Sequence, residues 1–156
     1  QVKEGDKIPS VELFRKNPGD KINIAQEIAS GPALLIGVPA AFSPGCSEKH
    51  IPGYVARPDK LEEFKGKVYI IVVNDAFVTN AWAKSLGLEG TGITILGDAD
   101  GKFVEELDVA FDATAILGNK RSKRFAIRTQ DGVVKKVAVE PDNTGVTVSS
   151  LEQFLP

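Results

Sequence analysis

Methionine is absent from this sequence of 156 residues, and cysteine, histidine and tryptophan occur once each. A single cysteine excludes a disulfide within the chain. One cysteine and one histidine are also too few to fill a structural zinc site, and no other metal or cofactor motif is present. Because an initiator methionine is missing, we expect a processed or trimmed chain from which any targeting segment has been removed.

Long apolar runs and an excess of charge of one sign are also absent. The longest nearly uninterrupted apolar run covers residues 33–42, far short of the ~20 residues that span a bilayer. Lysine and arginine number 19 against 21 acidic residues, which gives a formal charge of −2 and no basic field for nucleic acid. Without repeats or linker-like stretches, we expect one soluble domain over residues 1–156, with neither membrane nor nucleic acid as a partner.

Two short segments, residues 33–38 and 68–73, are apolar on both faces, which is typical of central strands covered by helices on both sides. A weaker strand is expected at residues 92–96. Between these segments, residues 75–86 predict a helix with Asn74 as its cap and with Phe77 and Trp82 among its apolar positions.

A second helix is predicted to begin at residues 43–45 and to be kinked or broken by Pro52 and Pro58. Later, the alternating segments 123–130 and 133–140 flank Asp131-Gly132, a strong hairpin signal, and residues 149–155 predict a closing helix. The order of elements predicts an α/β fold of thioredoxin-like topology, with a central mixed β-sheet flanked by helices.

Cys46 is placed where a thiol can become reactive. It follows the strand at residues 33–38 after a short loop and lies in the first turn of the next helix. Unpaired amides and the positive end of the helix dipole favour a thiolate there, and ligand sites gather at the carboxyl ends of such strands. The alternative, a small buried hydrophobic cysteine, remains open on these grounds alone.

His50 follows Cys46 by four residues, so the two could share a helical face. A Cys–His nucleophile pair would indicate an acyl hydrolase. No third orienting group is evident, and we favour a structural histidine that bonds the backbone or packs on the kinked helix.

The segment GVPAAFSPGCSEKHIPGY at residues 37–54 closely resembles the active-site loop of peroxiredoxins, with their pattern Pro-x-x-x-Ser/Thr-x-x-Cys. The atypical type II, or peroxiredoxin-five, subfamily is the nearest group. Further stretches agree in the same order along the chain, at residues 73–78, 118–125, 130–135 and 139–142. The resemblance therefore covers nearly the whole chain and implies a single redoxin domain.

This resemblance implies a thiol peroxidase that reduces hydrogen peroxide and organic hydroperoxides in antioxidant defence and redox homeostasis. Cys46 would be the peroxidatic nucleophile that becomes a sulfenic acid. Ser43 would orient the peroxide and contact the thiolate, and Pro39 would shield the pocket from water. Arg124, within the basic run at residues 120–124, would stabilise the thiolate and the charge that develops on the peroxide oxygens.

The chain departs from the family pattern in three ways. Ala40 stands where glycine is usual, and Ser43 replaces threonine, which loses the methyl group that restricts rotation. A resolving cysteine is missing both at residues 147–149 and at Ile70. We therefore expect a one-Cys mechanism with an external thiol reductant, which could be glutathione with glutaredoxin, or thioredoxin.

Three further expectations follow. Apolar residues near the site match regions through which type II relatives form homodimers, namely Phe42, Phe77, Ile116 and Leu117. A mitochondrial or cytoplasmic location fits the resemblance. A non-enzymatic redox sensor on the same fold is the main alternative function, and a slow reaction of Cys46 with peroxide would distinguish it.

Overall fold

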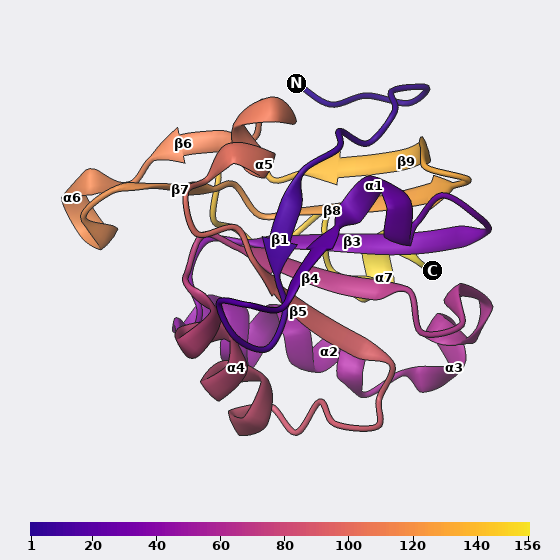
Figure 1. The fold of residues 1–156 in the computed structure, drawn as a ribbon, viewed down its shortest axis with the longest axis horizontal. Helices are drawn as coiled ribbons and strands as arrows, with labels where there is room; N and C mark the ends of the chain where they lie inside the picture. Colours follow the sequence, from indigo (N-terminus) through magenta and orange to yellow (C-terminus); the bar gives the residue numbers. More distant parts are fainter.

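A seven-stranded mixed sheet runs through the computed structural model, which describes residues 1–156 (Figure 1). The strands lie in the order β2-β1-β5-β4-β3-β8-β9, and β3, β4 and β5 are parallel to one another. A separate two-stranded sheet of β6 and β7 projects to one side (Figure 1). The strands are β1 Glu12–Phe14, β2 Lys21–Asn23, β3 Pro32–Val38, β4 Val68–Val72, β5 Ile93–Gly97, β6 Ala110–Asp112, β7 Lys120–Ser122, β8 Phe125–Gln130 and β9 Val133–Val139.

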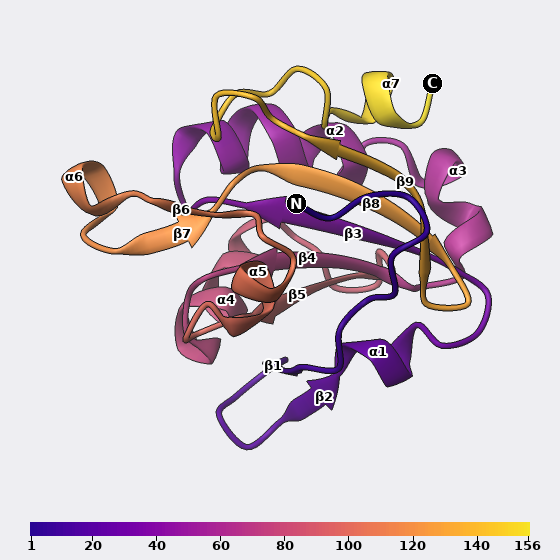
Figure 2. The same ribbon diagram turned by 90° about the horizontal axis from the view of Figure 1, so that it is seen from above.

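Helices cover both faces of the large sheet, and Figure 2 shows α2 and α7 on the opposite side from α1. None of the helices has the length and apolar character that crossing a bilayer requires. The helices are α1 Ile24–Glu27, the π-helix η1 Gly45–His50, α2 Ile51–Val55, α3 Pro58–Leu61, the 3-10 helix η2 Glu62–Phe64, α4 Ala76–Ser85, α5 Lys102–Glu106, α6 Thr114–Leu117 and α7 Leu151–Phe154.

The predicted mixed sheet and the thioredoxin-like fold are confirmed. Every residue of β4 is buried, because alternate side chains of this strand enter two different apolar clusters. The predicted hairpin is also present: Asp131 and Gly132 both have positive φ, at 51° and 79°, as a type I′ turn requires. The N-terminal hairpin of β1 and β2 and the β6–β7 sheet were not predicted from the sequence.

The helix after the cysteine differs from the expectation. It begins as a π-helix, in which the amide of Ile51 bonds the carbonyl of Cys46 five residues earlier, and becomes α-helical only in α2. Pro52 accounts for the change, because it lacks the amide proton that would bond Glu48 and its ring crowds that carbonyl. The closing helix α7 is shorter than predicted.

Two details of the predicted helix at residues 75–86 are wrong. Its cap is Asp75, whose carboxylate accepts from the amide of Val78, whereas Asn74 lies one residue too early. Phe77 is on the solvent side of α4, and the buried positions are Ala76, Thr79 and Trp82. The spacing of apolar residues suggested a different face from the one that packs.

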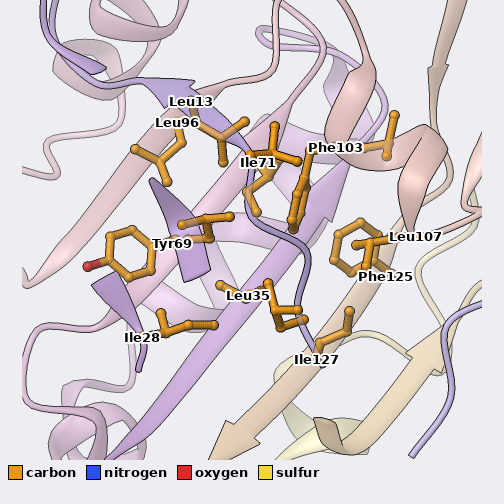
Figure 3. Packing of buried hydrophobic residues seen from close by; sticks show 14 of the residues in the cluster. Leu13, Ile28, Leu35, Tyr69, Ile71, Leu96, Phe103, Leu107, Phe125 and Ile127 are labelled. Carbon is orange, nitrogen blue, oxygen red and sulfur yellow. The ribbon is translucent and has the colours of Figure 1, made fainter. Parts of the chain in front are cut away.

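The apolar cluster on the α1 and α5 side contains no charged side chain (Figure 3). Phe103 of α5 packs there with Leu35, Ile71 and Phe125 from three strands. Phe125 lies against Gly37 of β3, where an added Cβ would come within 1.9 Å of the ring. Gly37 is therefore fixed by this close approach, and it ties β3 to β8 beside the end of β3 that leads to Cys46.

Candidate active site

Cys46 is fully buried in η1, just beyond the carboxyl end of β3. The loop between them is supported by the neighbouring strand, because the amide of Ala41 donates to Oδ1 of Asn74 at 3.1 Å. Asn74 follows β4, whose carboxyl end lies beside that of β3. The asparagine expected to cap a helix thus holds the loop that leads to the cysteine.

Arg124 lies against the thiol, with Nη1 at 3.3 Å from Sγ of Cys46. It stands immediately before β8 and is only 2% exposed, and its Nε donates to the carbonyl of Thr144 at 3.2 Å. No carboxylate forms a salt bridge with this guanidinium. Because a buried cation is stabilised by a nearby anion, Arg124 is placed to stabilise negative charge on the sulfur.

Gly45 makes room for this contact. A Cβ at this position would lie 2.9 Å from Nη2 of Arg124, which is closer than such atoms approach. The rest of the basic run behaves differently, because Lys120 and Lys123 are not buried and Arg121 bonds Asn119 at the surface. Among these basic residues, only Arg124 enters the site.

His50 bonds the backbone, as expected for a structural histidine: Nε2 lies 3.0 Å from the carbonyl of Ser149, and Nδ1 lies 3.2 Å from Nη1 of Arg124. Burial and the nearby charge of Arg124 lower the pKa of His50 to about 4. The imidazole is therefore neutral at neutral pH. It forms no hydrogen bond with Cys46, so the geometry does not make the Cys–His pair of a hydrolase.

Glu140, for which the sequence predicted no role, organises the loop after β9. Its carboxylate accepts from the amides of Thr147 and Ser149, both at 2.9 Å, and from their hydroxyls, both at 2.6 Å. Burial alone would raise the pKa of Glu140, but these hydrogen bonds outweigh it and hold the pKa below its usual value. Residues 139–142 are part of the family resemblance, but that resemblance implied no role for Glu140.

Ser43 and Pro39 lie in the loop between β3 and η1. Pro39 is buried at the start of the loop. The hydroxyl of Ser43 donates to the carbonyl of Ala40 at 2.8 Å and forms no hydrogen bond with Cys46. The expected contact between this hydroxyl and the thiolate is therefore not made in this arrangement, although rotation about the Cα–Cβ bond would redirect the hydroxyl.

Several large apolar side chains that were expected to lie near the site are exposed to solvent. Phe42, Phe77 and Ile116 are all more than half exposed, and Leu117 is half-buried. Trp82 is buried, and its Nε1 donates to the hydroxyl of Ser47, next to the cysteine, at 2.9 Å.

No group of His, Cys, Asp and Glu side chains is placed to hold a metal ion.

Comparison with known proteins finds relatives from a single protein family. The family model described as Redoxin matches residues 3–155. "Peroxisomal membrane associated protein 20" of Schizosaccharomyces pombe is 37% identical over 159 residues, which cover 99% of this chain and 97% of that protein. "Peroxiredoxin-2E-2, chloroplastic" of Oryza sativa is 36% identical over 163 residues, covering 97% and 70%.

Solved structures agree. Peroxiredoxin 5 from Alvinella pompejana superposes with a TM-score of 0.81 at 34% identity, covering 92% of this chain and 93% of that one. The reduced Prx3 from Vibrio vulnificus in complex with hydrogen peroxide has a TM-score of 0.89 at 32% identity, covering 99% and 98%. These similarities extend over nearly the whole chain.

Proposed function

The chain belongs to the redoxin family and is a peroxiredoxin, a thiol peroxidase, and from this premise we propose that Cys46 is the thiol that reacts with the hydroperoxide. Its thiolate attacks the terminal peroxide oxygen, so that an S–O bond forms as the O–O bond breaks. The remaining oxygen leaves with the electron pair and takes up a proton, giving water or an alcohol. Cys46 is oxidised to a sulfenic acid and the peroxide is reduced.

Arg124 stabilises this reaction electrostatically. The observation that carries the proposal is the buried contact of 3.3 Å between Arg124 and Cys46, with no carboxylate competing for the guanidinium. The fixed positive charge favours the thiolate before the reaction and the oxygen anion that develops during it. Ser43 would orient the peroxide after its hydroxyl turns from Ala40, and Pro39 would limit the entry of water.

Stopped-flow oxidation by hydrogen peroxide tests this proposal, with the single tryptophan Trp82 as a reporter beside Cys46. We expect Arg124→Ala to slow the reaction by roughly 100-fold or more, as the loss of one preorganised donor does elsewhere. Arg128→Ala is the matched control, because this arginine lies four residues further along, in β8, and pairs with Glu63 at the surface. A wild-type rate close to that of free cysteine would instead favour the redox sensor.

An external thiol completes the cycle. The chain has one cysteine, so no second thiol of the same chain can reduce the sulfenic acid. The incoming thiol attacks the sulfenic acid sulfur, releasing water and leaving a mixed disulfide, and a second thiol then frees Cys46. We propose glutathione with glutaredoxin, or thioredoxin, as the source of these thiols.

Turnover measured with each reductant, together with mass spectrometry of the oxidised protein, tests the reducing step. A mixed disulfide on Cys46 is the expected intermediate. If a Cys46–Cys46 disulfide between two chains carried most of the turnover, the external-thiol mechanism would be wrong.

A homodimer is the assembly that we propose, supported by the exposure of Phe42, Phe77 and Ile116. Sedimentation of Phe77→Ser should show a weakened dimer, and Lys84→Ser on the same helix is the control. A wild-type protein that sediments as a monomer at micromolar concentration would contradict this proposal.

Relatives carry names that place them in peroxisomes, mitochondria and chloroplasts. A mitochondrial or cytoplasmic location is our proposal for this chain. Imaging of the product of the complete gene tests it.

A further inference from the structure

The neutral histidine of the site occupies a central place in a buried hydrogen-bond chain. His50 is 1% exposed and lies between the guanidinium of Arg124, at 3.2 Å, and the carbonyl of Ser149, at 3.0 Å. Together the two contacts give each ring nitrogen of the buried imidazole a hydrogen-bond partner. Cys46, Arg124 and Tyr54 are the titratable groups around the ring, and Glu140 acts through Ser149.

The chemistry of the partners fixes the tautomer of the ring. A guanidinium has only donors, so Nδ1 of His50 must accept from Arg124 through its lone pair. The proton of the neutral imidazole therefore lies on Nε2, which donates to the carbonyl of Ser149. With its one lone pair engaged by Arg124, the ring has no free base to offer Cys46.

The same nitrogen of Arg124 serves both the histidine and the cysteine. Nη1 carries two N–H groups, and its two partners are Nδ1 of His50 at 3.2 Å and Sγ of Cys46 at 3.3 Å. Nε is held separately by the carbonyl of Thr144. Since the guanidinium is planar and rigid, a bond to His50 and a bond to Thr144 together fix the direction of the N–H that meets the sulfur.

His50 is in turn anchored to the loop after β9. The Ser149 carbonyl accepts from both His50 and Tyr54, the latter at 2.6 Å, while the amide and hydroxyl of Ser149 are held by Glu140. The anchor is therefore set by a carboxylate at the end of a strand rather than by the helix that carries the cysteine.

We propose that His50 is a positioning residue that orients the guanidinium of Arg124 toward Cys46 by accepting one of its N–H groups. The inference rests on the proposed role of Arg124. His50 transfers no proton in this scheme and does not touch the substrate. Without the acceptor, one N–H of Nη1 is buried and unpaired, and the guanidinium turns away from the sulfur to satisfy it.

Two amide substitutions separate the two bonds of the ring. In His50→Asn the amide oxygen reaches the place of Nδ1, which keeps the acceptor for Arg124 and gives up the bond to Ser149. In His50→Gln the amide nitrogen reaches the place of Nε2, which keeps the bond to Ser149 and gives up the acceptor. We expect Gln to slow oxidation by hydrogen peroxide roughly 10-fold, as the loss of other supporting groups does, and Asn to stay within about threefold of wild type.

The thiolate provides a second readout, through its ultraviolet absorbance followed against pH. In His50→Gln the thiolate should appear at higher pH than in the wild type, and in His50→Asn at the same pH. Tyr54→Phe is the matched control, because it removes the other bond to the Ser149 carbonyl and leaves Arg124 and His50 in contact. It should lower the unfolding free energy while the rate stays within about twofold.

Equal rates for His50→Gln and wild type, or equal losses for the Asn and Gln variants, would overturn the inference. The proposed function is separated from it by Arg124→Ala. If that variant reacts as fast as wild type, the role of Arg124 itself is wrong. If it is slow while His50→Gln is not, only the positioning role of His50 falls.

Discussion

The two faces of the large sheet are both buried, yet they differ in kind. The face covered by α1 and α5 holds a cluster of 20 residues, all apolar. The face covered by α2, α3, α4 and α7 holds 19, and beside them lie Arg124, His50 and Glu140, each at most 2% exposed. Beside the first cluster the buried carboxylate of Asp98 accepts from the amides of Phe103 and Val104 in α5, away from the cysteine. The second face carries a connected set of buried charged and polar groups that must be matched by hydrogen bonds.

The difference shows why the chemistry is confined to one side. Arg124 and His50 bond each other, and all three side chains, Glu140 included, bond backbone groups of the loop at residues 144–149. An apolar layer tolerates volume-conserving changes, but such a network fails when one member is removed. We therefore expect substitutions on the two faces to have separable effects.

The largest effect should come from Cys46→Ser on the site face. A serine hydroxyl is a far weaker nucleophile than a thiolate, so peroxidase activity should fall by roughly 1000-fold or more. The unfolding free energy should change little, because the two side chains are close in size. Turnover assays together with urea denaturation measure both quantities, and retained activity would remove Cys46 from the mechanism.

Phe103→Ala should produce the opposite pattern from the apolar face. The ring is fully buried between α5 and the sheet, and its loss costs about 3–5 kcal/mol of unfolding free energy. Oxidation rates per folded molecule should match wild type. Phe103→Leu, with a smaller loss, keeps the comparison possible if the alanine variant does not fold. A rate defect in a folded variant would show that the two faces are coupled.

The pH dependence of stability should sharpen the contrast through His50. Its pKa is about 4 in the folded protein and near 6.5 when unfolded, so the unfolded chain binds the proton first as pH falls. The unfolding free energy should therefore decrease from pH 6.5 to 4, by about 3 kcal/mol from this residue. Above pH 6.5 the residue contributes no slope.

His50→Asn should lose this slope. Chemical denaturation of both proteins at several pH values between 4 and 7 measures the difference. Glu140 and Asp98 titrate in both proteins and cancel in the comparison. Parallel stability curves would show that His50 is not buried in its neutral form.

The smallest effect is expected at Ser43. Ser43→Thr restores the methyl group that restricts side-chain rotation, which should raise the oxidation rate by no more than about threefold. Ser43→Ala, which has no hydroxyl, is the control and should be slower than both. A threonine variant slower than wild type would mean that the bond to the Ala40 carbonyl is the functional arrangement.

Much of the fold could be predicted from the sequence because the signals are local. The apolar segments of β3 and β4, and the turn at Asp131 and Gly132, depend on neighbours within a few residues. The hairpin of β1 and β2 is short and mostly polar, and its strands have three residues each, so no periodicity marks it. The π-helical turn was also missed, although Pro52 gave its position as a break.

The site residues also divide into those that local sequence signals predict and those that they do not. Cys46 could be found from its place after a strand, and Arg124 only through resemblance to a family, since the four basic residues at positions 120–124 look alike in sequence. The role of Glu140 could not be predicted, although residues 139–142 are part of the resemblance, because its partners Thr147 and Ser149 lie on a loop whose path is not encoded by periodicity. The buried face of α4 was predicted wrongly because Phe77, although apolar, is 71% exposed.

The sequence by itself determined that one thiol is present, that it follows a central strand, and that no second cysteine in the chain can resolve it. Those conclusions rest on counts and on short-range order. Only the tertiary structure decided which cation meets the thiol and which form the histidine takes. Arg124 and Cys46 are 78 residues apart, and contacts at such a separation depend on how the whole sheet is assembled.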